Sequence, residues 1–272
     1  VQMAREGLLV DWYSGLVTAS SAKALSLDPH AAAMFLDEGT WPIMGSWTGT
    51  TPRRLDQRAL AASLQTIAIE GPRALYEGSL ARALAQDVQA KGGCLAEADL
   101  AAYQAQWVEP LTVAYRGGHV HAAPGLTGGP TFAQALQLLE QAFLPTGQGA
   151  DAQAYEAIAR TLAAAFRTRL SDMGDHESPK APGCTTHFSV VDRHGNMCAV
   201  TQTLLSIFGS RVVSPSTGLL LNNGIMWFDP EPGKANSLAP NKRVLANYCP
   251  VVGVGADGRQ FALGASGGRK IL

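Results

Sequence analysis

The sequence lacks an excess of charge of either sign and lacks a long apolar run. Its 272 residues carry 21 basic and 22 acidic side chains, for a net charge of −1. Without a basic excess, neither nucleic acid nor an anionic membrane surface is expected as a partner. Apolar residues make up 46% of the chain, but no uninterrupted stretch approaches the roughly 20 residues that span a bilayer. We therefore expect a soluble globular protein with no membrane partner.

The chain is also poor in cysteine. Its four cysteines are widely separated and form no Cys-x-x-Cys pair, so neither a zinc site nor a disulfide framework is predicted. We expect no metal and no cofactor. The first residues lack the pattern of a secretory signal, but a removed signal leaves no trace, so cytoplasmic and periplasmic locations both stay open.

The first 180 or so residues favour helices. Apolar residues recur on one face over 57–69 and over 79–91, and Gly92-Gly93 supplies the positive φ that ends the second helix. A short strand is expected around 112–121. It precedes a helix with Pro130 in its first turn.

A further long helix is predicted after Asp151, which has the side chain of an N-cap. Its expected buried stripe is Tyr155, Ile158, Leu162 and Phe166.

From Thr185 onward the apolar period becomes that of strands. Several of these segments are apolar on both faces, which favours a sheet held between layers. The expected strands cover 185–192, 197–205, 218–223, 250–254 and 260–264.

Thr185 is the candidate nucleophile. A threonine hydroxyl inside a chain is a poor nucleophile, but cleavage of the Cys184–Thr185 bond would give Thr185 its own amine, and the pKa of a chain-terminal amine is ordinarily about 7.7–8.0. Nucleophile and base would then lie in one residue.

A strand pairing brings Thr203 toward Thr185. If 193–196 form a four-residue loop, Thr185 lies opposite Leu204 and Thr186 opposite Thr203, and a slip of one residue leaves the Thr203 hydroxyl near Thr185. That hydroxyl would orient the nucleophile. Thr-x-Thr is equally well explained as ordinary strand composition.

A glycine-rich segment, Gly264-Ala265-Ser266-Gly267-Gly268, follows the last expected strand. Glycines let backbone N–H groups approach a reacting carbonyl, which is the geometry of an oxyanion hole. Such loops are common, so the segment indicates an oxyanion hole only in combination with Thr185.

Motifs in both halves together resemble the gamma-glutamyltransferases (gamma-glutamyltranspeptidases), which are self-processing N-terminal-nucleophile hydrolases. They recur in order over nearly the whole chain. These motifs include Glu70-Gly71-Pro72, Leu75-Tyr76-Glu77-Gly78, Asp99-Leu100-Ala101-Ala102-Tyr103, Tyr115-Arg116-Gly117, Thr185-Thr186-His187-Phe188-Ser189, Leu221-Asn222-Asn223, Pro240-Asn241-Lys242-Arg243 and Gly267-Gly268.

The resemblance implies an α+β fold, a four-layer αββα sandwich. It implies cleavage into a mainly helical large-subunit part, 1–184, and a small-subunit part of mainly strands, 185–272, which together form one domain. Thr185 would be the nucleophile, Thr203 its supporting hydroxyl, and Gly267 and Gly268 the oxyanion-hole amides. The two subunits of one precursor and a small amide substrate are the implied partners, with a homo-oligomer left open.

Other positions depart from the family's pattern. In the family, acidic and amide residues that follow the Leu-Asn-Asn motif hold the amino group of the glutamyl substrate. The motif ends here at Asn223, and the corresponding positions are Gly224 and Trp227. The serines after Pro-Asn-Lys-Arg appear as Ala246 and Asn247. We take Asn223, Trp227 and Asn247 as candidate substrate-binding residues, although Trp227 fits a core position equally well. Leaving the charged ends of a glutamyl group unpaired costs several kcal/mol.

We therefore expect an amidohydrolase or acyltransferase with altered acyl specificity, similar to the cephalosporin-acylase-like and oxamate-hydrolase-like branch. Arg211 is a candidate for a substrate carboxylate, although a solvated loop arginine is the commoner case. One alternative is an ordinary gamma-glutamyl hydrolase or transferase acting on glutathione. Another is a family member that has lost catalysis and serves as a binding module.

The resemblance also predicts that this domain is incomplete at both ends. The family's early segment, with a substrate-binding arginine, would precede Val1, and its closing elements would follow Leu272. The stretch between Met173 and Cys184 is shorter than usual for the family.

Overall fold

The computed structural model describes residues 1–44, 52–145, 147, 149–173 and 183–267. The chain divides into two compact units. Unit 1 comprises Val1–Gln106 and Ile207–Asn222, and unit 2 comprises Trp107–Ser206 and Asn223–Leu272. Within the described ranges, no helix combines the length and apolar character needed to cross a membrane.

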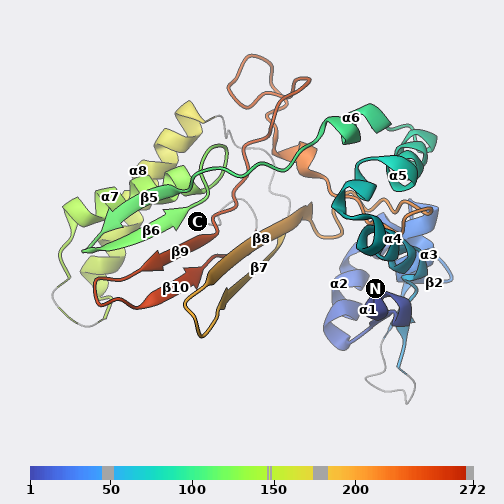
Figure 1. Cartoon of the computed structure of the whole chain (residues 1–272), viewed down its shortest axis with the longest axis horizontal. Coiled ribbons are helices and arrows are strands. Elements are labelled where there is room, and N and C mark those ends of the chain that lie inside the picture. The colour runs from blue at the N-terminus through green and yellow to red at the C-terminus, as the bar shows by residue number, and fades with distance from the viewer. Residues whose placement is uncertain (45–51, 146, 148, 174–182, 268–272) are drawn as a thin grey trace. The chain divides into compact units, whose positions relative to one another are not determined.

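Unit 1 is mainly helical (Figure 1). Two short antiparallel ladders join β1 to β4 and β2 to β3. Its elements are α1 (Gln2–Glu6), β1 (Leu8–Leu9), α2 (Trp12–Leu25), α3 (Pro29–Phe35), β2 (Leu36–Asp37), β3 (Trp41–Pro42), β4 (Arg54–Leu55), α4 (Arg58–Glu70), the 3₁₀ turn η1 (Pro72–Leu75), α5 (Gly78–Ala90) and α6 (Glu97–Ala102). The helices predicted at 57–69 and 79–91 are thus confirmed to within one residue.

The core of unit 1 depends on the segment that returns at 207–222. Val213 from this segment is buried in the same cluster as Leu25 and Phe35, and Phe208 packs edge-on against Phe35. The predicted strand at 218–223 is wrong, because Leu220 forms only an isolated bridge to Val213. These apolar residues cover helices and do not extend a sheet.

Asp87 on α5 ties this returning segment to the helices. Its carboxylate accepts hydrogen bonds from the Ser214 hydroxyl at 2.5 Å and from the Ser216 N–H and hydroxyl, both at 2.9 Å. Burial raises the pKa of Asp87, but the hydrogen bonds from Ser214 and Ser216 outweigh it and lower the pKa below its usual value. The folded state therefore favours the carboxylate form.

We expect Asp87→Asn to lower the free energy of unfolding by about 1.5–3 kcal/mol at neutral pH, because charged hydrogen bonds to the two serines are lost. A depressed pKa stabilises the folded state above the unfolded carboxyl pKa of about 3.9, and the stabilisation is lost as the pH falls through the folded pKa. The difference in free energy of unfolding between variant and wild type, measured by urea unfolding, should thus become smaller at acidic pH. Glu70→Gln is the control, since Glu70 is an exposed carboxylate of the same unit. An equal effect of both variants would contradict this role.

Unit 2 is built on a four-stranded antiparallel sheet in the order β10-β9-β6-β5. The single strand predicted around 112–121 is wrong: it is a hairpin, because Arg116 and Gly117 both adopt positive φ and reverse the chain. The elements of unit 2 are β5 (Leu111–Tyr115), β6 (Gly118–Ala122), α7 (Gly129–Ala142), α8 (Ala152–Asp172), β7 (Gly183–Val191), β8 (Met197–Ser206), the 3₁₀ turn η2 (Gly224–Trp227), β9 (Val251–Val254) and β10 (Gln260–Leu263).

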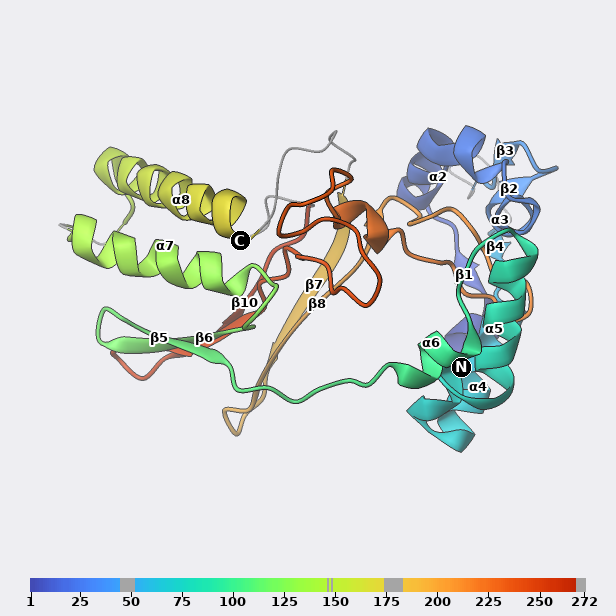
Figure 2. The same cartoon turned by 90° about the horizontal axis from the view of Figure 1, so that it is seen from above.

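Two long helices, α7 and α8, form a layer beside this sheet (Figures 1 and 2). Phe132 and Leu136 of α7 pack against buried sheet residues. Asp151 caps α8 as predicted, its carboxylate accepting from the Ala154 N–H at 2.8 Å.

The predicted buried stripe of α8 is wrong at its first member. Tyr155 is 65% exposed, and the buried positions are Ala154, Thr161, Ala165 and Arg169. Small side chains at three of these positions let the two helices approach closely, so the larger side chains are left at the margin.

Candidate active site around Thr185

The site begins on a ribbon of two long strands, β7 and β8, which lies beside β10 (Figure 1). Thr185 pairs directly with Thr203. The predicted pairing with Leu204 is therefore wrong by one residue. The reason lies in the turn, where the Asp192 N–H donates to the Asn196 carbonyl at 3.0 Å, so Asp192 lies opposite Asn196 and not Met197. The Asp192 carboxylate holds this turn by accepting from the N–H groups of His194 and Asn196, at 2.8 and 2.9 Å.

The Thr185 and Thr203 hydroxyls are in contact. Thr185 Oγ1 donates to Thr203 Oγ1 at 3.2 Å, and Thr203 Oγ1 accepts from the Leu205 N–H at 2.9 Å. Both threonines are half-buried. Thr203 thus lies where its hydroxyl fixes the direction of the Thr185 hydroxyl.

The ladder is irregular at the bond before Thr185. Cys184 pairs with Leu205, so the register shifts between Cys184 and Thr185, and Leu205 adopts a positive φ of 75°. A left-handed conformation at a non-glycine residue costs about 1–3 kcal/mol and persists only where the surroundings enforce it. Bulges of this kind are frequent beside active sites.

His187 is a residue whose role the sequence did not suggest. Its Nδ1 lies 2.8 Å from Thr201 Oγ1 and its Nε2 lies 2.8 Å from Ser189 Oγ, so both ring nitrogens have partners on the ribbon. A Cβ placed on Gly264 would lie 2.1 Å from the ring. A larger residue at position 264 would clash with the His187 ring. Because Gly264 has no side chain, the start of the glycine-rich segment can pack against β7.

The remaining glycines were predicted to form the oxyanion hole. Gly267 adopts a φ of 130°, which favours glycine, and apart from its chain neighbours no described residue has an atom within 4 Å of where its Cβ would be. Gly268 lies outside the described residues. The predicted oxyanion role of both stays a prediction.

Asn223 holds the end of β8. Its Oδ1 accepts from the Ser206 N–H at 3.0 Å, its Nδ2 donates to the Ser206 hydroxyl at 2.9 Å, and its own N–H donates to the Leu204 carbonyl at 3.1 Å. These bonds fix the strand that carries Thr203. Contact between Asn223 and a substrate stays a prediction.

Trp227 and Asn247 are both buried, at 7% and 4% exposure. Trp227 lies in a cluster with Leu205 and Ala246, and its ring meets Tyr248 edge-on at 5.3 Å. Its Nε1 has no hydrogen-bond partner among the described residues. Trp227 thus occupies a core position against the end of β8 that follows Thr203, and a role in an acyl pocket stays a prediction.

Asn247 is bound to a buried arginine. Its Oδ1 accepts from Arg169 Nη2 at 2.6 Å, and the same guanidinium donates to the carbonyls of Thr127 and Ala246, at 2.8 and 3.0 Å. Asn247 therefore helps to satisfy a charge that is 1% exposed. Its predicted contact with a substrate is not tested by this bond.

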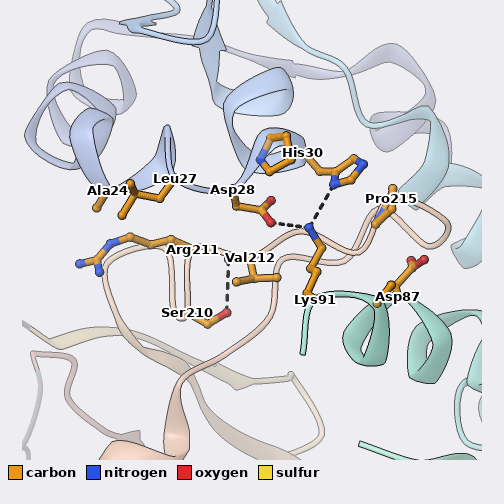
Figure 3. Close-up of a pocket in the computed structure, with 12 residues that line it drawn as sticks. Ala24, Leu27, Asp28, His30, Asp87, Lys91, Ser210, Arg211, Val212 and Pro215 are labelled. Carbon is orange, nitrogen blue, oxygen red and sulfur yellow. Dashed lines mark hydrogen bonds and ion pairs between the residues drawn. The ribbon is translucent and has the colours of Figure 1, made fainter. Parts of the chain in front are cut away.

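Arg211 belongs to unit 1 and lines a cavity there (Figure 3). It is half-buried, with a φ of 61°. Its Nε is buried and has no partner among the described residues. Whether Arg211 holds a substrate carboxylate or is a solvated loop arginine stays a prediction.

Other chemistries find less support in this part of the chain. Burial raises the pKa of the Cys249 thiol to about 11, which keeps it protonated and unreactive at neutral pH. In the described ranges, no group of three or more histidine, cysteine or acidic side chains is arranged to hold a metal ion. The threonine pair is thus the arrangement best suited to nucleophilic chemistry.

The architecture and the hydroxyl pair define a protein of mixed helices and sheet with a candidate nucleophile near the start of a strand. The sequence matches the family model of gamma-glutamyltranspeptidase over residues 1–184 and 177–272. The chain belongs to the gamma-glutamyltranspeptidase family.

Its curated relatives fall into two groups by name. Acylase ACY 1 proenzyme of Pseudomonas sp. (strain V22) is 33% identical over all of this chain and 54% of its own length, and glutathione hydrolase proenzyme of Escherichia coli (strain K12) is 30% identical with the same coverage. The chain thus spans about half the length of these relatives.

Solved structures share the fold. Cephalosporin acylase from Bacillus halodurans matches with a TM-score of 0.77 over 97% of this chain and 54% of its own, at 22% identity. Helicobacter pylori gamma-glutamyltranspeptidase matches with a TM-score of 0.56 over 64% of this chain and 48% of its own, also at 22% identity.

Proposed function

We propose that the chain is part of a self-processing threonine amidohydrolase or acyltransferase whose acyl specificity differs from gamma-glutamyl. The observation that carries this proposal is the 3.2 Å contact between the Thr185 and Thr203 hydroxyls, beside a register shift, in a chain of this family. The proenzyme names of the relatives support cleavage of a precursor, and we place that cleavage before Thr185.

Cleavage of the Cys184–Thr185 bond frees the Thr185 amine. That amine takes the proton of the Thr185 hydroxyl as Oγ1 attacks the carbonyl carbon of the substrate amide. The carbon–nitrogen bond then breaks, the proton passes to the departing amine, and an acyl ester remains on Oγ1. Water or an acceptor amine attacks this ester and restores the hydroxyl.

The charge that develops on the carbonyl oxygen needs N–H donors, for which we propose Gly267 and Gly268. The contact of Gly264 with His187 supports this assignment, because it fixes the segment's start against the nucleophile strand. Gln260 Nε2 donates to the Gly195 carbonyl at 3.2 Å. Between Gln260 and Gly264 the chain therefore passes along β7 from its far turn toward Thr185.

We further propose the four-layer αββα sandwich as the complete fold, cut into the parts 1–184 and 185–272. The layer formed by α7 and α8 and the two sheets of unit 2 support this proposal. Phe188 and Val190 lie on the face of the ribbon opposite to the Thr185 side chain, and they are 48% and 54% exposed. Their exposure supports a fourth layer that covers them.

The altered acyl specificity rests on the positions that hold a glutamyl group in the family. Gly224 has no side chain, Trp227 and Ala246 are buried in one apolar cluster, and Asn247 is bound to Arg169. A glutamyl ammonium would find no carboxylate at these positions. The acylase relatives favour the same conclusion.

A comparison of acyl anilides tests this specificity. Purified protein should run as two fragments on a denaturing gel, with Thr185 at the start of the smaller one. The kcat/KM for glutaryl or aromatic acyl anilides should exceed that for gamma-glutamyl anilide by at least about tenfold. A higher kcat/KM for gamma-glutamyl anilide would favour an ordinary gamma-glutamyl hydrolase acting on glutathione. An uncleaved, inactive chain would favour a binding module.

A further inference from the structure

Unit 1 contains a cavity of about 610 Å³ that the proposed chemistry at Thr185 does not use. The C-terminal ends of α2 and α5, the start of α3 and the returning segment line it (Figure 3). This volume lies in the usual range for small-molecule sites, about 300–1,000 Å³. The cavity therefore has room for an organic molecule and not only for a simple ion.

Most charged groups around the cavity already have partners. Lys91 Nζ pairs with the Asp28 carboxylate and lies 3.0 Å from His30 Nδ1. Asp28 also accepts from the Ala31 N–H at 2.8 Å. Asp87 is held by Ser214 and Ser216, as described above. Neither carboxylate is left to neutralise a further cation.

Arg211 is the exception. Its guanidinium forms no hydrogen bond or ion pair with any residue in the described part of the chain, and its Nε is buried. A half-buried guanidinium without an anion is unfavourable, and arginine binds carboxylates through two parallel N–H donors. Ala24 and Leu27 lie beside the Arg211 side chain and offer an apolar wall to the body of a ligand (Figure 3).

The backbone fixes Arg211 in this position. The Arg211 N–H donates to the Phe208 carbonyl at 2.7 Å, and on either side Ser210 and Val212 are bonded to Leu221, at 2.9 Å each. The positive φ of Arg211 is therefore enforced from both sides. Strained positions that are held in this way are typical of ligand-binding sites.

We propose that this cavity binds the carboxylate of a small organic acid through Arg211, with the aliphatic body of the acid against Ala24 and Leu27. The carboxylate belongs to a small acid that occupies this cavity of unit 1 by itself. Arg211 supplies the charge, and the apolar wall selects against inorganic anions.

The test uses Thr185→Ala protein, in which no ligand is consumed, and titrates glutarate, its neutral analogue glutaramide, and phosphate by calorimetry. Glutarate should bind in preference to the other two. Adding Arg211→Gln should weaken glutarate binding at least about tenfold, as expected for a charged hydrogen-bonded pair. Adding Arg5→Gln, at an exposed arginine of the same unit, is the control and should leave the affinity unchanged. Equal affinity in the Arg211 and Arg5 variants would overturn the proposal.

A second measurement needs no substitution and so does not depend on folding of a variant. Phenylglyoxal modifies accessible arginines, and mass mapping of the unsubstituted protein should show that glutarate protects Arg211 while glutaramide does not. Absence of protection at saturating glutarate would contradict the proposal.

Kinetics check that the acid is separate from the amide substrate of the proposed function. In Arg211→Gln protein with Thr185 intact, KM for glutaryl anilide and for an uncharged acyl anilide should both stay unchanged while glutarate binding is lost. A rise in KM for glutaryl anilide alone would contradict a separate acid. The binding result stands even if the Thr185 chemistry fails.

Discussion

Thr185→Ala should abolish both cleavage of the chain and amide hydrolysis. The variant lacks the hydroxyl that attacks the amide, and removal of a nucleophile from such a unit costs about 10⁴-fold or more in kcat. A denaturing gel and an anilide assay measure the two effects. Thr185→Ser should retain part of each, because serine keeps a hydroxyl beside the amine.

Thr186→Ala is the matched control for this substitution. Thr186 is exposed and pairs with Gln202, so its side chain lies on the opposite face of β7 from Thr185. We expect this variant to be cleaved and active. Activity in Thr185→Ala, or loss of activity in both variants, would contradict the assignment of the nucleophile.

Thr203→Val should lower kcat by about 10²-fold, with little change in KM. Valine has nearly the shape of threonine but cannot hydrogen-bond to the Thr185 hydroxyl, and a positioned proton partner contributes about this much to a rate. It also leaves the Leu205 N–H without the acceptor that lies 2.9 Å away. Anilide kinetics on the cleaved protein measure the effect.

Thr203→Ser should restore most of the rate, since the hydroxyl returns. Gln202→Ala, at an exposed neighbour on the other face of β8, should behave as wild type. Melting temperatures of the three variants separate a loss of stability from a loss of catalysis. A kcat for Thr203→Val equal to that of Gln202→Ala would show that Thr203 is only a strand residue.

Local patterns predicted those parts of the fold that depend on neighbours in sequence. The helix Arg58–Glu70 and the N-cap at Asp151 follow from apolar spacing and from one side chain, and both are confirmed. The strand expected at 218–223 is wrong, because Leu220 packs against a cluster that includes Leu25 and Phe35, helical residues far earlier in the chain. Apolar spacing does not carry that information.

At the candidate site, too, the sequence predicted local features but not contacts between distant segments. The sequence placed the Thr203 hydroxyl near Thr185, but the register was wrong by one because Asp192 lies opposite Asn196 instead of Met197. Gly264 attracted notice as part of a glycine-rich segment, while its packing against His187 depends on a contact between elements some 75 residues apart. Such contacts arise only in the folded chain.

The most direct test of the central claim is mass spectrometry of the Thr185-led fragment during turnover. Protein mixed with an excess of a good acyl anilide and quenched in acid should show that fragment heavier by one acyl group, with the added mass mapped to Thr185. Thr185→Ala protein should show no such addition. Turnover with the acyl group on another residue, or with an uncut chain, would contradict the account.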